Sequence, residues 1–339
     1  MSATTLVVER AGHAVAQDLG RPSHGSIGIP VNGALDEGAA RTANLLVGNA
    51  EGAPLVEVTD SELSLVTESD LLLSVTGAAE TVVIDGHRQP SWETLAVSAG
   101  ARVVVPAPVT GYRSYLAVNG TLRAHRALGS VSPDHLLGVG TPITAGDRLV
   151  VDSRYNTHAP APLGRVFRLG ARRPRMSARL VIRVTEGPDL ARLSRGRDAL
   201  TDVIRLLPQS DHVGLRLACA PLNQTSSEEI VSRGVPVGAV EVPPTGGIII
   251  LLRGRLITAG YPVVAVVTTE SLDLLAQARP GDSVTLSFCD VAAAHAALHA
   301  RAAERSALAA RVCAAFTAKG LADVLDPCRH TTTTRGSTT

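Results

Sequence analysis

The first part of the chain contains a glycine-rich segment that carries several ionisable side chains. Residues 15–49 read VAQDLGRPSHGSIGIPVNGALDEGAARTANLLVGN, and Asp18, Arg21 and Asp36 lie there among glycines and prolines. Glycine allows backbone N–H groups to approach a ligand closely, and the guanidinium group of an arginine matches the geometry of a carboxylate. The segment therefore has the composition of a binding site for a carboxylate-bearing ligand.

Structural roles compete with binding at each of these positions. Asp36 directly precedes an apolar periodic segment, where an aspartate can cap the first turn of a helix. Asp18 and Arg21 are three residues apart, so an ion pair between them would also hold the loop. Asn44 and Asn49 can bind the backbone of a turn as readily as a substrate. The residues alone leave both interpretations open.

A second polar segment lies at 210–222 and reads SDHVGLRLACAPL. It contains His212 and Arg216, four residues apart, although Gly214 argues against a regular helix between them. A catalytic histidine needs an orienting partner. Asp211 is adjacent, but adjacent residues of a strand point to opposite faces. His212 is therefore a candidate base without an evident partner.

A third segment, residues 231–262, reads VSRGVPVGAVEVPPTGGIIILLRGRLITAGYP. Thr258 and Tyr261 belong to a turn of small residues, where the backbone can come close to a ligand. Glu241 lies in an alternating strand before two prolines. We expect its carboxylate to be solvated unless the strand faces a cleft.

The composition argues against several classes of function. Lys319 is the only lysine, which excludes a P-loop and leaves no plausible Schiff-base lysine. A net charge of +1 and an aromatic content of 2% argue against nucleic-acid binding. The four cysteines form no CxxC pair, so we expect no metal site. We expect a cytoplasmic protein, because its apolar runs are too short to span a membrane.

Two β-rich blocks must position these segments. Short runs such as PLVEV, LLLSV and YLAV follow one another between turns in the first block, after a helix predicted over 37–47. Both blocks close with a Gly-Asp turn that leads into a strand. The predicted divisions are a β domain at 1–155, a linker at 156–179, a β domain at 180–290, an alanine-rich helical extension at 291–330 and a disordered tail at 331–339.

Several of these motifs together resemble the biotin-dependent carboxyltransferase-like family. The similarity covers residues 5–290. In the first block it rests on QDLGR at 17–21, Gly28-Ile29-Pro30 with Gly33 and Asp36, ANLLVGN at 43–49, Glu57, and YLAVNG at 115–120. In the second block it rests on RGVPVGAVEVPPTG, ITAGYP and AQARPGD.

The resemblance implies a mainly β fold of two cyclophilin-like β-barrel domains with few helices. It also implies a hydrolase subunit, of the type found as the C subunit of 5-oxoprolinase or as allophanate hydrolase subunit 2. Such a subunit takes part in the ATP-dependent opening of 5-oxo-L-proline to L-glutamate with a B-type, kinase-inhibitor-like subunit and an A-type subunit. ATP, with Mg²⁺, would be held by a partner, and no cofactor is expected on this chain.

Two alternatives remain open within this family. One is the carboxyltransferase component of a urea-carboxylase-like biotin system. The other is a non-catalytic regulatory module that antagonises a kinase inhibitor. The second alternative needs only a surface for a B-type subunit and no intact catalytic centre.

The polar segments and the resemblance together predict roles for individual residues. The catalytic group consists of Asp18, Arg21 and His212. The substrate-binding group consists of Asp36, Asn44, Asn49, Tyr115, Arg216, Glu241, Thr258 and Tyr261. The chain departs from the family pattern at His212, Glu241, Gly254 and Ala259, where arginine, glutamine, aspartate and glycine are usual. Because fixed polar donors at a reacting centre contribute strongly to rate, these departures predict a changed substrate or a reduced activity.

Overall fold

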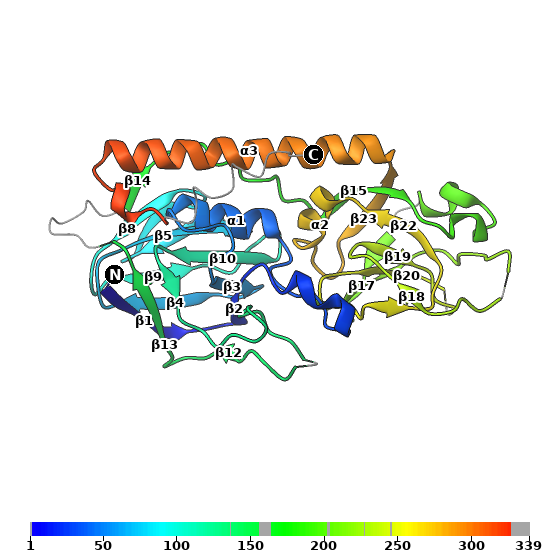
Figure 1. Cartoon of the computed structure of the whole chain (residues 1–339), viewed down its shortest axis with the longest axis horizontal. Coiled ribbons are helices and arrows are strands. Elements are labelled where there is room, and N and C mark those ends of the chain that lie inside the picture. The colour runs from blue at the N-terminus through cyan, green and yellow to red at the C-terminus, as the bar shows by residue number, and fades with distance from the viewer. Residues whose placement is uncertain are drawn as a thin grey trace, which may run out of the picture.

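The fold is mainly β, as the sequence predicts. The computed structural model describes residues 2–135, 137–155, 164–201, 204–226, 228–244 and 246–326. The N-terminal half contains two seven-stranded sheets, and the C-terminal half contains a closed barrel. Figure 1 shows the two halves side by side, with one long helix lying along both.

The two sheets of the N-terminal half pack face to face around one apolar core. Their strand orders are β11-β13-β1-β4-β9-β6-β7 and β12-β2-β3-β10-β5-β8-β14. The bounds are β1 (Ser2–Arg10), β2 (Ala14–Gln17), β3 (Leu55–Thr59), β4 (Leu63–Thr67), β5 (Leu71–Gly77), β6 (Thr81–Ile84), β7 (His87–Pro90), β8 (Thr94–Val97), β9 (Arg102–Val105), β10 (Arg113–Val118), β11 (Thr121–Leu122), β12 (Pro142–Ile143), β13 (Arg148–Ser153) and β14 (Gly164–Phe167). Every residue of β5 and β10 is buried, because a helix, α1 (Glu37–Leu46), contacts both strands on the face opposite the other sheet.

The closed barrel of the C-terminal half has the strand order β15-β22-β19-β20-β17-β16-β23. Its strands are β15 (Arg179–Glu186), β16 (Ile204–Leu206), β17 (Gly214–Ala218), β19 (Ala239–Glu241), β20 (Ile248–Leu251), β22 (Val263–Val267) and β23 (Ser283–Phe288), and a separate pair is formed by β18 (Arg233–Gly234) and β21 (Thr258–Ala259). β15 and β23 pair in parallel, and the other neighbours are antiparallel. Closure pairs each barrel strand on both sides, which protects the strand edges.

The two β blocks end in the same local structure, as their sequences predict. Gly146 and Gly281 adopt positive φ angles of 91° and 93°, which other residues rarely tolerate. Asp147 and Asp282 each accept a hydrogen bond from the backbone N–H three residues earlier. These turns lead directly into β13 and β23.

The helix predicted at 37–47 is confirmed as α1. Oδ1 of Asp36 accepts a hydrogen bond of 2.8 Å from the backbone N–H of Ala39, so Asp36 caps the helix. Gly48 follows the helix with a φ of 81°, the conformation that terminates many helices. The remaining helices are α2 (Thr269–Leu275), α3 (Val291–Ala318) and the short 3₁₀ helices η1 (Pro22–Ile27), η2 (Leu190–Arg192), η3 (Gly196–Leu200) and η4 (Ala322–Val324).

Helix α3 occupies most of the predicted alanine-rich extension and returns to the N-terminal half (Figure 1). Its Leu308, Val312 and Phe316 are buried there. The ring of Phe316 stacks on that of Phe167 at 5.0 Å between centroids. The helix therefore packs on the half from which it is more distant in sequence.

The predicted linker contains a strand. β14 lies within residues 156–179 and pairs with β8, because its apolar side chains complete the sheet edge beneath α3. Residues 156–163, 327–330 and the predicted disordered tail at 331–339 lie outside the described residues. No helix in the described ranges has the length and apolar character needed to cross a membrane.

Candidate functional site

Asp18 is enclosed by its own protein. Its Oδ1 accepts hydrogen bonds from the hydroxyls of Ser130 and Ser132 at 2.6 and 2.7 Å and from the N–H of Gly20 at 2.8 Å. Its Oδ2 accepts from the N–H of Val131 at 2.9 Å. Because these bonds use both carboxylate oxygens of a buried side chain, they fix the loop around Asp18.

Arg21 does not pair with Asp18, so that interpretation is wrong. Its guanidinium group donates to Oδ2 of Asp134 at 3.1 Å and to the carbonyl of Ser132 at 2.6 Å. The side chain is 0% exposed. The expected match between this arginine and a carboxylate is present, but the carboxylate comes from the same chain. Asn32 donates to the same oxygen of Asp134 at 2.7 Å.

Asn44 and Asn49 bind turn backbone, the structural alternative that the sequence left open. Nδ2 of Asn44 donates to the carbonyls of Glu51 and Ala53. Asn49 donates to the carbonyl of Val118 and to Oδ1 of Asn44, and its own Oδ1 accepts from a backbone N–H. Both side chains are almost fully buried, so they connect the end of α1 to the second sheet.

His212 lies in a turn before β17, where its ring is 5.1 Å from the ring of His135. Burial lowers the pKa of His212 below its ordinary value. Asp211 makes no hydrogen bond to the ring in the described chain; its Oδ1 accepts from the backbone N–H groups of Val213 and Gly214 instead. A Cβ at Gly254 would overlap Cδ2 of His212 and lie 3.1 Å from its Nε2. Two of the departures from the family pattern therefore contact each other.

The third polar segment assembles elsewhere, at strands β18, β19 and β21. Glu241 is 2% exposed and not solvated as expected, because it lies inside β19 between two barrel strands. Burial raises its pKa to about 7, and its Oε1 has no hydrogen-bond partner among the described residues. Thr258 and Tyr261 are exposed near this region, and Arg216 is exposed on β17.

A buried polar cluster lies beneath the start of α1. The hydroxyl of Tyr115 accepts a hydrogen bond of 3.0 Å from the N–H of Asp36. Burial raises the pKa of Glu57, against the opposing effects of Arg113 and Tyr115. Tyr115 is fully buried and supports the N-terminus of α1.

Gln277 joins this cluster from the C-terminal half, a role that its sequence context did not predict. Its Nε2 donates to Oδ2 of Asp36 at 2.7 Å and to the carbonyl of Arg113 at 3.1 Å. Its Oε1 accepts from the N–H groups of Tyr112 and Arg113 at 3.0 and 2.9 Å. The motif AQARPGD contains this residue, and that match is the signal that could have found it.

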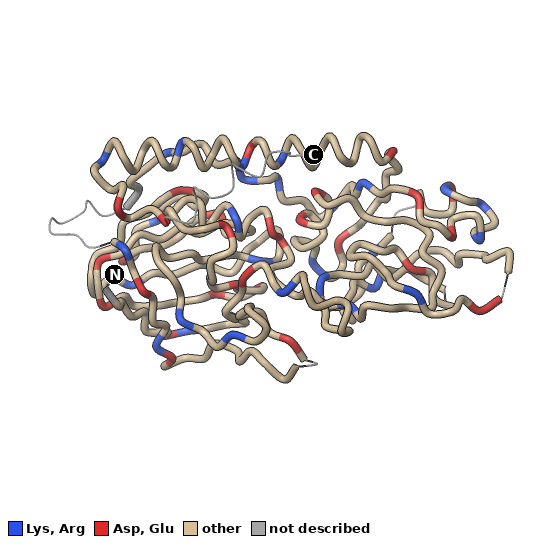
Figure 2. Tube along the Cα trace, viewed as in Figure 1, with Lys and Arg blue, Asp and Glu red and all other residues tan. Residues whose placement is uncertain are grey.

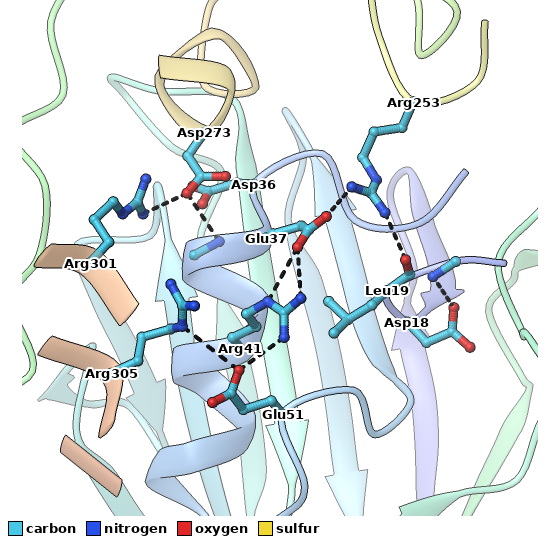
Figure 3. Close-up of polar contacts among 12 residues, drawn as sticks. Asp18, Leu19, Asp36, Glu37, Arg41, Glu51, Arg253, Asp273, Arg301 and Arg305 are labelled. Carbon is cyan, nitrogen blue, oxygen red and sulfur yellow. Dashed lines mark hydrogen bonds and ion pairs between the residues drawn. The ribbon is translucent and has the colours of Figure 1, made fainter. Parts of the chain in front are cut away.

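A second carboxyl group of the C-terminal half also reaches α1. Oδ2 of Asp273 accepts a hydrogen bond of 3.2 Å from the N–H of Gly38 and pairs with Arg301 of α3. Figure 3 shows Asp273 directed toward Asp36. Burial and the neighbouring charge of Asp36 raise the pKa of Asp273 to about 7. Burial likewise raises the pKa of Asp36. Both groups thus retain protons at a higher pH than ordinary aspartates.

These two aspartates lie in the wall of a cavity of about 830 Å³. Its walls are the start of α1, Trp92, the segment 170–176, the end of α2 and the middle of α3. A smaller cavity of about 490 Å³ shares Gly38 and Asp273 with it. Buried carboxyl groups with raised pKa values in a concave site are typical of acid–base chemistry, so this junction is the candidate functional site.

Ion pairs connect the two halves beside the cavity (Figure 3). Arg253 of the barrel donates to the carbonyls of Leu19 and Asn32 at 2.7 Å and pairs with Glu37. Glu37 also pairs with Arg41 along α1. The N-terminal segment, α1 and the barrel are thereby held together at one place.

The predicted site residues are distributed over both halves. Asp134, which pairs with Arg21, directly precedes His135, whose ring contacts that of His212, so the loop around Asp18 and Arg21 lies beside the turn at His212. Glu241 and Thr258 belong to strands β19 and β21. Only Asp36 of the predicted set lines the cavity. The residues that join it there come from the C-terminal half: Asp273 lies in α2, and Gln277 follows the C-cap of that helix, Ala276.

The chain is similar to known proteins over most of its length. The C subunit of 5-oxoprolinase from Escherichia coli (strain K12) is 33% identical over 293 residues, which are 84% of this chain and 92% of that protein. The structure of TTHA0988 is 32% identical with a TM-score of 0.73, over 85% of this chain and 56% of that one. The K. lactis urea amidolyase structure has a TM-score of 0.81 at 21% identity, over 90% of this chain and 20% of that one.

This chain therefore spans little more than half of TTHA0988 and one fifth of the urea amidolyase. The likeness to the urea amidolyase shows the fold alone. The family described as carboxyltransferase domain, subdomain A and B, matches residues 27–288. This match covers most of both halves and the whole of α1 and α2, and the chain belongs to that family.

Proposed function

We propose that this chain is a subunit of an ATP-dependent amidohydrolase of the 5-oxoprolinase type. The observation that carries the proposal is the 33% identity to the C subunit of a 5-oxoprolinase over 92% of that protein. In the proposed reaction the ring C–N bond of 5-oxo-L-proline breaks. One water supplies a hydroxyl to the carbonyl carbon and a proton to the nitrogen, and a second water is consumed as ATP is converted to ADP and phosphate.

The cavity at the junction has groups that suit this chemistry. A carboxyl group that keeps its proton near neutral pH can donate it to an amide oxygen or to a departing nitrogen. Asp273, whose pKa is raised to about 7, is the better proton donor. Oδ2 of Asp36 already accepts a hydrogen bond from Gln277. Asp36 would therefore position the N-terminus of α1 and help to keep the pKa of Asp273 raised.

The remaining parts of the reaction are assigned to partner chains. The relatives are named as subunits of a 5-oxoprolinase, which indicates an assembly, and we propose A-type and B-type partners. ATP with Mg²⁺ would lie on a partner, because the only lysine of this chain, Lys319, is not part of a P-loop sequence. The cytoplasmic location remains a prediction.

Co-expression with A- and B-type subunits tests the function. The complex should release glutamate from 5-oxo-L-proline only when ATP is present, and omission of this chain should abolish the release. A second arm replaces the substrate with urea and adds biotinylated carrier protein. If turnover occurs only with urea and the biotinylated carrier protein, the chain is a carboxyltransferase component and not a hydrolase subunit. Complex formation without turnover in either arm would leave the regulatory module as the function.

A further inference from the structure

The cavity at the junction is lined by an excess of basic side chains. In Figure 2 basic residues gather where the segment before β15 passes beneath α3. Three come from the segment 170–176 and three from α3. They are Arg172, Arg173, Arg175, Arg301, Arg305 and Arg311.

The protein uses only some of these arginines for its own structure. Arg173, Arg301 and Arg311 are each held by an ion pair or by a hydrogen bond to a carbonyl of this chain. Arg172 and Arg175 make neither kind of contact with the rest of the described chain. Both are exposed and both line the cavity. They remain available to a ligand.

The acidic groups of the cavity do not neutralise this pair. Glu270 is paired with Arg183 outside the cavity, and Asp273 is paired with an arginine of α3. Burial of Asp36 opposes its ionisation and raises its pKa. Only Glu304, which is exposed on α3, adds a charge without a partner in the described chain.

Arg305 of α3 and two apolar side chains also line the cavity. Nε of Arg305 is buried without a hydrogen-bond partner in the described chain, 3.7 Å from Glu51. Trp92 and Leu308 are 5% exposed and line the same cavity. A cavity that combines guanidinium groups with an aromatic and aliphatic wall suits a ligand with an anionic end and a compact nonpolar body.

We propose that this cavity binds a small organic anion, whose carboxylate or phosphate oxygens contact Arg172, Arg175 and Arg305 while its nonpolar part packs on Trp92 and Leu308. The identity of the anion rests on the proposed function, in which the carboxylate of 5-oxo-L-proline would contact these three arginines. The amide of that substrate would then face Asp273 across the cavity. Binding itself requires no partner subunit.

Isothermal titration calorimetry of the full chain tests this binding. The probes are 5-oxo-L-proline, inorganic phosphate, and 2-pyrrolidinone, which has the same ring without the carboxylate. The variants are Arg172→Gln with Arg175→Gln, and Arg168→Gln as the matched control. Arg168 is exposed on the same connection but does not line the cavity. Thermal unfolding of each variant verifies that the fold is retained.

The wild type and Arg168→Gln should bind 5-oxo-L-proline, phosphate or both, and the double variant should bind at least tenfold more weakly. Binding of 5-oxo-L-proline, of phosphate or of both shows whether the cavity recognises a carboxylate, a phosphate or either group. Absence of anion binding, equal affinity in the double variant, or equally tight binding of 2-pyrrolidinone would overturn the proposal. Arginine-dependent binding without turnover by the complex would refute only the proposed reaction. Turnover with an unchanged KM in the double variant would refute only this site.

Discussion

Nε2 of Gln277 donates a hydrogen bond of 2.7 Å to Oδ2 of Asp36, and this bond joins the barrel to the N-terminal half. The other side-chain hydrogen bonds of Gln277 all reach backbone groups of Tyr112 and Arg113. A buried amide with its donors and acceptor satisfied fixes the groups around it. This residue therefore sets the position of Asp36 relative to Asp273, on which the proposed chemistry depends.

The first prediction concerns this amide. Gln277→Ala should lower the free energy of unfolding by about 2–4 kcal/mol, because a buried carboxyl and two backbone N–H groups lose their partner. Thermal and urea unfolding measure the change. Gln89→Ala, on strand β7 near the surface, serves as the control and should stay within about 0.5 kcal/mol of wild type. Equal effects of the two substitutions would show that the junction does not depend on Gln277.

The second prediction concerns the contact between His212 and Gly254. Gly254→Ala should destabilise the protein by about 1–3 kcal/mol, because the added Cβ overlaps the histidine ring. His212→Ala in the same chain should recover most of this loss. The double-mutant cycle should thus give a coupling free energy well above about 0.5 kcal/mol. Additive effects would mean that the two departures from the family pattern are independent.

The third prediction concerns the pH dependence of stability. The folded state holds a proton on Glu241 up to a pH of about 7, whereas the unfolded chain releases it near pH 4.5. The folded state therefore binds more protons between these values, and the free energy of unfolding must fall as pH rises through this window.

Ionisation of Glu241 should lower the free energy of unfolding by on the order of 3 kcal/mol as the pH rises through this window. Glu241→Gln should remove this decrease, so that the variant gains stability relative to wild type at pH 8 but not at pH 4. Urea unfolding at both pH values measures the difference. Asp290→Asn, which changes a carboxyl at the exposed N-terminus of α3, should show no such gain. If the free energy of unfolding of Glu241→Gln changes between pH 4 and pH 8 by the same amount as that of wild type, Glu241 is not buried in its protonated state.

The fourth prediction concerns the attachment of α3. Phe316→Ala should cost about 3–5 kcal/mol, because it empties a buried site against Phe167. Hydrogen exchange should accelerate along the C-terminal part of α3. Leu298→Ala, at a partly exposed position of the same helix, should leave this exchange unchanged. Unchanged protection in Phe316→Ala would show that α3 is held by other contacts.

Local features of the fold could be predicted because they depend on neighbouring residues. Asp36 caps α1 and Gly48 ends it, as their positions beside an apolar periodic segment indicate. The Gly-Asp turns before β13 and β23 are likewise local. β14 was not predicted, because four residues in a proline- and arginine-rich context acquire strand structure only by pairing with β8.

The candidate site could not be predicted for the same reason. Asp273 and Gln277 are far from Asp36 in sequence and reach it only after the barrel packs beside α1. A carboxylate such as Asp18 gives no sequence sign that Ser130 and Ser132 will enclose it. Glu241 alternates with apolar residues in sequence, yet the closed barrel buries it.

The most direct measurement of the central claim is the turnover of 5-oxo-L-proline by the assembled complex that contains Asp273→Asn. Asparagine keeps an acceptor for the N–H of Gly38 but has no proton to give, so kcat should fall by about 100-fold or more. The wild-type kcat should decline above pH 7 as Asp273 ionises. Asp290→Asn, the same change at the N-cap of α3 and outside the cavity, should retain wild-type turnover. If Asp273→Asn turns over as fast as Asp290→Asn with the wild-type pH profile, the cavity at the junction is not where this subunit acts.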